Sequence, residues 1–126
     1  MVCLDTSVLI DYLLGDKNVI KLVESHIESG DGVCTTAITE YELNKHHDKL
    51  KRELAKGLLD TLHVYYFDRN SAIEASKVFQ SLSDAGKMIN ENDILIAGIA
   101  IANNQLLVTR DKRFNDISGY GKILVF

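Results

Sequence analysis

Four acidic residues lie far apart in this sequence, and each one follows an apolar run or stands near the start of a helical pattern. Asp5 comes directly after the first apolar run, and Glu42 lies near the start of a predicted helix. Asp93 opens the most apolar helix, and Asp111 follows another short apolar run. Carboxylates gathered in one place repel one another and raise one another's pKa, so an ionised cluster needs a compensating cation.

A hard divalent cation would suit such a set of side chains. Mg²⁺ prefers octahedral oxygen coordination, and it usually binds one or two protein carboxylates together with waters and substrate phosphate oxygens. The four residues supply carboxylate oxygens only, with neither a His nor a Cys among them. The donor types therefore predict a site for a hard cation if the fold brings the acids together.

The elements that must position these acids follow from the apolar pattern. Short apolar runs that are typical of buried parallel strands occur at 2–4, 33–35, 62–67, 106–108 and 123–125. Helical spacing occurs at 8–13, at 19–27, from Thr36 or Thr39 onward, through a basic stretch to about Leu59, at 73–82 and at 93–103. We expect Thr6 and Ser7 to cap the first helix.

This alternation of strands and helices predicts an α/β fold, a three-layer α/β/α sandwich with a central parallel sheet of about four to five strands. In such a sheet the functional crevice lies beyond the carboxyl ends of the strands, which is where the four acids are expected. The length of 126 residues predicts a single domain over residues 1–126.

The composition, with 46% hydrophobic and 25% charged residues, is typical of a globular protein in water. The longest apolar stretch, 94–102, is shorter than a bilayer span, and no targeting signal is visible, so we expect a cytoplasmic protein without membrane contact. Cys3 and Cys34 lie inside apolar runs, and we expect both in the core.

Four segments around the acids resemble a known family. They are MVCLDTSVLID around Asp5, TEYEL around Glu42, LSDAGKMINENDILIAGIA around Asp93 and LLVTRDKRF around Asp111. They are similar to the signature segments of PIN-domain ribonucleases and, within that family, to the VapC-type toxins of prokaryotic toxin–antitoxin pairs. The resemblance extends over residues 2–125, in the family's order.

The resemblance implies a metal-dependent endoribonuclease. The catalytic and metal-binding residues would be Asp5, Glu42, Asp93 and Asp111, and the cofactor would be Mg²⁺ or Mn²⁺. Such ions polarise the phosphate to be cleaved and lower the pKa of the attacking water. Hydroxyl groups that could orient the carboxylates stand beside the acids at Thr6, Ser7 and Thr109.

The resemblance also implies partners, namely an RNA substrate, a homodimer and a cognate antitoxin protein whose C-terminal segment occupies the acidic cleft. Two alternatives keep the same fold. One is a housekeeping PIN-domain nuclease that acts in RNA processing, and the other is a non-catalytic binding module. A binding module is expected to have lost at least one acid, and all four are present.

Each acid also has an ordinary structural explanation. Thr39 and Glu42, for example, have the spacing of a capping box. Helix capping alone does not explain why all four positions carry an acid. Asn or Ser would cap a helix as well, without the repulsion between carboxylates. Glu40 is a rival for the second acid, but the pair Glu42 and Leu43 matches the family's Glu-Leu pair.

The net charge of −4 hides a segregated pattern. Residues 44–56 carry a local charge of +3, so the rest of the chain carries −7. Two interpretations of this basic stretch stay open: a solvated helix face with opposite charges paired at i,i+4 spacing, or a surface that contacts phosphates. The candidate contacts to an RNA backbone are Lys45, Lys49, Arg52, Arg110 and Lys112.

Overall fold

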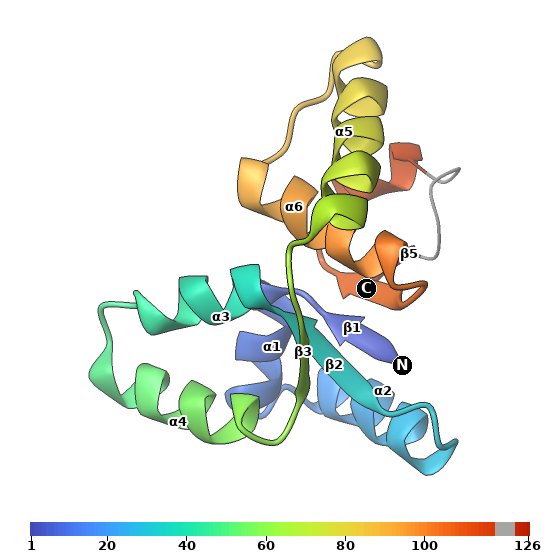
Figure 1. Cartoon of the computed structure of the whole chain (residues 1–126). Helices are drawn as coiled ribbons and strands as arrows, with labels where there is room; N and C mark the ends of the chain where they lie inside the picture. Colours follow the sequence, from blue (N-terminus) through green and yellow to red (C-terminus); the bar gives the residue numbers. More distant parts are fainter. Residues whose placement is uncertain (118–122) are drawn as a thin grey trace.

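A five-stranded parallel sheet forms the centre of the protein, which is seen here as a computed structural model that describes residues 1–117 and 123–126 (Figure 1). Its order is β3-β2-β1-β4-β5, with strands β1 (Val2–Leu4), β2 (Val33–Thr36), β3 (His63–Tyr65), β4 (Leu106–Thr109) and β5 (Ile123–Val125). The chain runs outward from β1 to β3 on one side and continues with β4 and β5 on the other. The order therefore reverses between β1 and β4, and a crevice is expected at that point.

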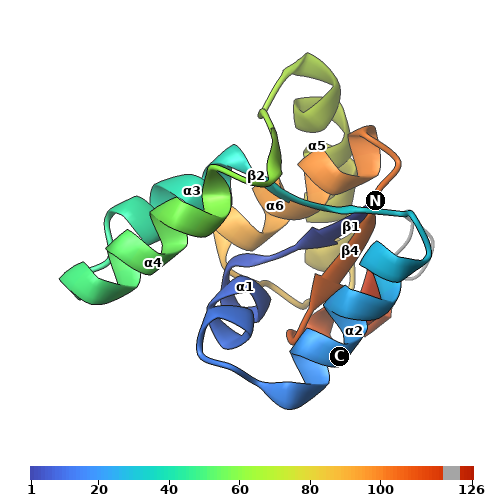
Figure 2. The same cartoon turned by 90° about the horizontal axis from the view of Figure 1, so that it is seen from below.

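Helices cover both faces of this sheet, as Figures 1 and 2 show. Their bounds are α1 (Thr6–Leu13), α2 (Lys17–Glu28), α3 (Ala37–Asn44), α4 (Lys49–Leu59), α5 (Arg69–Asp84) and α6 (Glu91–Ala102), and a 3₁₀ helix spans Lys112–Ile117. In Figure 1, α5 and α6 lie above the sheet, and α1, α2 and α4 lie below it. The predicted three-layer sandwich is confirmed.

Two hydrophobic cores lie on opposite faces of the sheet because successive strand side chains point in opposite directions. Within β1, Val2 and Leu4 pack toward α1, α2 and α4, whereas Cys3 packs toward α5 and α6. All three side chains are buried. Cys34 is paired with Cys3 in the strand register and is equally buried, so the prediction that both cysteines are core residues is confirmed.

Polar side chains cap the N-termini of the helices and thereby fix where each helix begins. Asp16, Thr36 and Asn90 accept hydrogen bonds from the first free backbone N–H groups of α2, α3 and α6. The predicted caps of α1 were wrong, because Asp5 is the cap and Thr6 is already helical. The carboxylate of Asp5 reaches the N–H of the third residue after it, which is the favoured capping geometry.

Helices α5 and α6 approach each other closely at Gly98. A Cβ atom at this position would lie 2.6 Å from the Cβ of Ala75 and 2.7 Å from the backbone oxygen of Ser71. The absence of a side chain lets the two helices touch, and α6 is buried along most of its length. The predicted central position of the 93–103 helix is confirmed, and the helix begins two residues earlier than predicted, at Glu91.

The largest departure from the predicted elements is at the sheet edge. Strand β3 covers only His63–Tyr65 instead of 62–67, and Tyr66 is 75% exposed. An edge strand has one neighbour only, so its ends lack the pairing that would extend it. Among the described residues, no helix is long and apolar enough to cross a membrane.

Candidate active site

Asp5 stands at the carboxyl end of β1, at the point where the strand order reverses. Its backbone N–H donates to the carbonyl of Val108, so it continues the pairing of β1 with β4 before α1 begins. Its side chain is only 6% exposed and accepts hydrogen bonds from the Val8 N–H at 2.9 Å and the Ser7 hydroxyl at 3.2 Å. Burial raises the pKa of Asp5, although the bonds from Thr109, Val8 and Ser7 oppose that rise.

Glu42 reaches the same edge from the second turn of α3. Its Oε1 atom accepts a hydrogen bond of 2.6 Å from the hydroxyl of Thr6 in α1. The Thr6 hydroxyl oxygen also lies 3.2 Å from that of Thr39, which is fully buried and lies one turn before Glu42. These contacts hold α3 against α1 and direct Glu42 toward the end of β1.

Asp93 lies in the first turn of α6, three residues after the cap Asn90. Burial is the largest cause that raises the pKa of Asp93 to about 6, and repulsion from Asp5, Glu42 and Asp111 adds to it. All three other acids therefore lie near enough to act on the charge of Asp93. The structure brings the four predicted acids to one edge of the sheet.

Asp111 follows β4 and is held by Arg113. Two side-chain bonds join the pair, from Nε to Oδ1 at 2.9 Å and from Nη2 to Oδ2 at 2.8 Å. The guanidinium lowers the pKa of Asp111, in contrast to the raised pKa of Asp93. The sequence analysis did not identify this pair, although the i,i+2 spacing of the two opposite charges after a strand indicates it.

The three predicted hydroxyl groups all contact the acids. Thr6 donates to Glu42, and Ser7 donates to Asp5. The hydroxyl of the buried Thr109 accepts from the backbone N–H of Asp111 at 3.1 Å, and it also lowers the pKa of Asp5, so it acts on two of the acids. Hydroxyl groups in these places orient carboxylates without adding charge.

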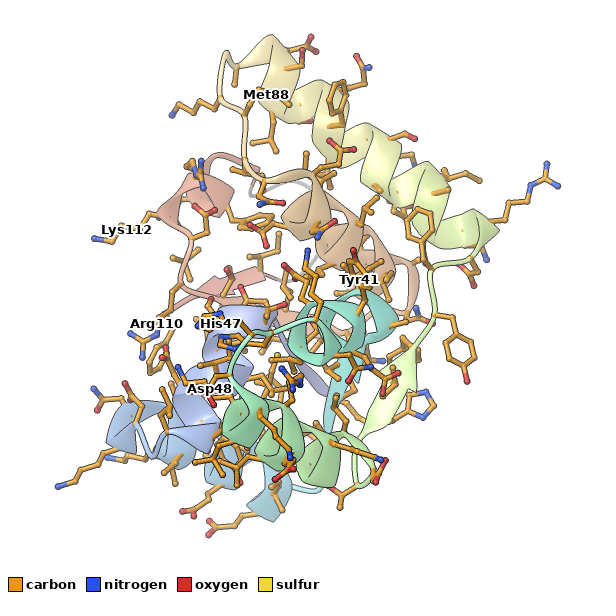
Figure 3. All side chains as sticks on the ribbon, turned by 90° about the vertical axis from the view of Figure 1, so that its left-hand side faces the viewer. Tyr41, His47, Asp48, Met88, Arg110 and Lys112 are labelled. Atoms are coloured by element: carbon orange, nitrogen blue, oxygen red, sulfur yellow. The ribbon has the colours of Figure 1, made fainter. Side chains whose placement is uncertain are left out.

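The predicted basic residues differ in their surroundings, and Figure 3 labels two of them, Arg110 and Lys112. Arg110 is bound by two carboxylates, from Nε to Asp11 at 2.7 Å and from Nη2 to Asp16 at 3.1 Å. Its guanidinium also lies over the ring of Phe126, 4.9 Å from the centroid. It therefore joins the β4 end to α1, to the cap of α2 and to the last residue of the chain.

Of the other four basic residues, the three lysines are exposed and Arg52 is partly buried. Lys112 projects outward from the 3₁₀ helix in Figure 3 and is exposed, as is Lys49 at the start of α4. Lys45 lies over the exposed ring of Tyr41, with its Nζ atom 4.8 Å from the centroid. Arg52 donates to the backbone carbonyl of His46, so it closes the α3–α4 loop.

The donor set at this edge fits a hard divalent cation in its chemistry. Burial is the largest cause of the raised pKa of Asp93, and the three other carboxylates add repulsion that a cation would relieve. Within residues 1–117 and 123–126, no three His, Cys, Asp or Glu side chains are arranged to hold one ion together. Mg²⁺ needs only one or two protein carboxylates, because waters and phosphate oxygens complete its shell.

Known proteins share the sequence pattern and the fold of this chain. The model of the PIN-domain family matches residues 2–120. The chain belongs to the PIN-domain family. Ribonuclease VapC1 from Methanocaldococcus jannaschii is 29% identical to this PIN domain over 122 residues, which cover 95% of the chain and 83% of that relative.

Solved structures show the same fold for this PIN domain. VapBC2 from Rickettsia felis, bound to a DNA fragment from the promoter, matches with a TM-score of 0.82 and 20% identity, over 98% of each chain. VapBC-1 from nontypeable Haemophilus influenzae matches with a TM-score of 0.78 and 23% identity, over 98% of this chain and 97% of that one. FitAcB from Neisseria gonorrhoeae matches with a TM-score of 0.76 and 22% identity, over 98% and 96%.

Proposed function

We propose that this PIN domain is an endoribonuclease that hydrolyses RNA phosphodiester bonds with the help of Mg²⁺ or Mn²⁺. One observation carries the proposal: carboxylates from four separate segments converge, and their mutual repulsion contributes to the raised pKa of Asp93. A protein that gained nothing from such a cluster would not be expected to keep it, because the repulsion destabilises the fold. The name of the relative, Ribonuclease VapC1, supports RNA as the substrate.

The roles of the side chains follow from their contacts. The cation would bind to one or two of the carboxylates of Asp5, Glu42, Asp93 and Asp111, with waters completing its shell. The hydroxyls of Thr6 and Thr109 would keep Glu42 and Asp5 in place. When bound, the cation polarises the phosphate and lowers the pKa of the water that attacks it. No imidazole contacts these acids among the described residues, so none of the four His side chains is assigned a part.

We further propose that this nuclease is the toxin of a toxin–antitoxin pair. Two solved relatives, VapBC-5 from Mycobacterium tuberculosis and a complex from Klebsiella pneumoniae, are toxin–antitoxin systems by name, and an apolar patch on this chain supports a protein partner. It lies between α1, α3 and α4, where Leu14 is 61% and Leu54 is 47% exposed. A helix with an apolar face would cover these side chains. The homodimer that the family resemblance implies stays a prediction.

Cleavage of total RNA by the purified chain tests the nuclease proposal. Wild type should cleave with Mg²⁺ or Mn²⁺ and should stop in EDTA. Asp5→Asn, Asp93→Asn and Asp111→Asn should each lose activity by several orders of magnitude, because each removes a charged ligand. Asn keeps the capping ability at position 5, so circular dichroism should show an intact fold.

Glu40→Gln is the matched control for Glu42→Gln, because Glu40 is two residues away on α3 and its charge is not among those that act on Asp93. The control should retain activity within a few fold, and Glu42→Gln should not. Undiminished cleavage in EDTA, or in the Asp5→Asn and Asp93→Asn double variant, would reject the proposal. Growth arrest on expression of wild type but not of Asp5→Asn would favour a toxin over a housekeeping nuclease.

A further inference from the structure

Both carboxylate oxygens of Asp111 are engaged by one residue of the same loop. Arg113 donates from Nε to Oδ1 at 2.9 Å, from Nη2 to Oδ2 at 2.8 Å and from its backbone N–H to Oδ1 at 3.0 Å. A planar guanidinium that meets a carboxylate with two parallel bonds is the strongest neutralising contact that a side chain offers. The charge of Asp111 is therefore already compensated from within the chain.

The guanidinium of Arg113 is anchored on its other side as well. Its Nη1 atom donates to the backbone carbonyl of Met88, 3.2 Å away in the segment that links α5 to α6. Asp93 follows that segment in the first turn of α6. Arg113 thus joins the loop that bears Asp111 to the segment that leads to Asp93.

Arg113 takes up three of the roughly four lone-pair sites of the Asp111 carboxylate. A divalent cation that needs more than the site left on Oδ2 must displace a guanidinium bond, and even at that site it meets the repulsion of the guanidinium charge. The Arg113 side chain is 53% exposed, so it has room to turn into solvent, whereas Asp111 is 18% exposed and confined by the loop. The other nearby arginine, Arg110, does not compete, because Asp11 and Asp16 hold it.

We propose that Arg113 is a built-in counter-cation that competes with the divalent metal for Asp111 and thereby sets the metal affinity of the site. Arg113 is a positioning residue and makes no contact with substrate in this role. The inference rests on the proposed function, since it takes Asp111 as a metal ligand. In the metal-free protein the guanidinium of Arg113 stabilises the acidic edge. When a metal binds, the divalent cation replaces the guanidinium as the positive charge beside Asp111.

Mn²⁺ binding to the metal-free, full-length protein tests this inference without any measurement of cleavage. Electron paramagnetic resonance measures the concentration of free Mn²⁺ during a titration. Arg113→Gln should bind Mn²⁺ roughly three- to ten-fold more tightly than wild type, because the competing bidentate pair is gone. Arg113→Lys should lie between the two, since an ammonium keeps the charge and loses the planar fork.

Lys112→Gln is the matched control. It removes the same charge one residue away, from an exposed side chain that is not bonded to Asp111. Its Mn²⁺ affinity should equal that of wild type. Thermal unfolding adds a second measurement: metal-free Arg113→Gln should melt below wild type, and saturating Mn²⁺ should raise its melting temperature by more.

The outcomes separate this inference from the proposed function. Equal Mn²⁺ affinity in wild type and Arg113→Gln, weaker binding in Arg113→Gln, or equal tightening in Lys112→Gln would each overturn the competition. If wild type and Asp111→Asn bound Mn²⁺ equally poorly, the metal site itself would be rejected, and the inference would fall with it. Tighter binding in Arg113→Gln alone supports the inference.

Discussion

Two aspartates at the same edge experience opposite surroundings. Asp93 faces three other carboxylates, which together with burial raise its pKa to about 6, whereas Arg113 lowers the pKa of Asp111. One group is therefore protonated more easily than usual and the other less easily. Residue type alone predicted that these acids would matter. Residue type did not predict that the pKa of Asp93 would be raised and that of Asp111 lowered, because this difference depends on the direction of the Arg113 side chain.

The raised pKa of Asp93 has a consequence for stability in the absence of metal. The native state binds the proton of Asp93 more tightly than the unfolded state, so this group's contribution to stability falls as pH rises from about 4 to about 6. Asp93→Asn should therefore raise the unfolding free energy at pH 7 by about 1 kcal/mol, a value discounted for partial exposure. Urea unfolding in EDTA at pH 4.5 and pH 7 measures it.

Asp68→Asn is the control of opposite sign for this experiment. Hydrogen bonds from Ser71 lower the pKa of Asp68, so its ionised form favours the folded state above its unfolded pKa. Both pH values lie above the usual pKa of an aspartate, so this variant should lose stability relative to wild type at pH 4.5 and at pH 7 alike. If the unfolding free energy at pH 7 rose in both variants, the cause would be the reduced net charge of the protein and not the repulsion at the acidic edge.

At the scale of elements, the sequence predicted the order and type of the strands and α-helices in the described parts of the chain, because buried parallel strands and amphipathic helices differ in length and period. The errors lie at ends. Asp5 is the cap of α1, and β3 stops before Tyr66. Ile73 and Phe79, which belong to the helical pattern at 73–82, are 50% and 37% exposed. Apolar spacing shows that a helix has a buried face but not how wide that face is.

The contact between α5 and α6 gives a prediction at this scale. Gly98→Ala would place a methyl group 2.6 Å from the Cβ of Ala75, so the helices must separate. We expect a loss of about 1–3 kcal/mol in unfolding free energy, as is typical of overpacked cores. Gly57→Ala on α4 is the matched control, because a Cβ atom at that position would have no neighbour within 4 Å, and it should gain about 0.5–1 kcal/mol from helix propensity.

Urea unfolding of both glycine variants in the same buffer measures the two changes. Opposite signs support the close packing of α5 against α6. A neutral Gly98→Ala variant would mean that the two helices are free to move apart.

At the scale of the whole molecule, the strand order brings the four acids to one edge of the sheet, although they lie far apart in the sequence. Asp5 and Asp111 follow β1 and β4, the two strands between which the order reverses, and α3 and α6 bring Glu42 and Asp93 to them. This gathering could be predicted from the rule for open parallel sheets. The pairing of Arg110 with Asp11 and Asp16 could not, because it joins segments from opposite ends of the chain through side-chain directions.

The segregated charge predicts how RNA binding responds to salt. In an inactive Asp5→Asn background, Lys45→Gln with Lys49→Gln should weaken binding and flatten the plot of log affinity against log salt by about 0.7 for each phosphate that is no longer neutralised. Lys21→Gln with Lys77→Gln removes the same charge from α2 and α5 and should leave the slope unchanged. Fluorescence anisotropy with a single-stranded RNA measures both. Equal slopes in the two double variants would make the basic stretch a solvated helix face.

Asp5 caps α1, and under the proposed function the same carboxylate would also bind the metal. A substitution that removes the side-chain oxygen would therefore weaken the fold as well as the metal site. A descendant that had abandoned cleavage would therefore still carry Asp, Asn, Ser or Thr there, while Glu42, which caps nothing, would be replaced first. Loss of ancestral activity in such lineages would show at position 42 before it showed at position 5.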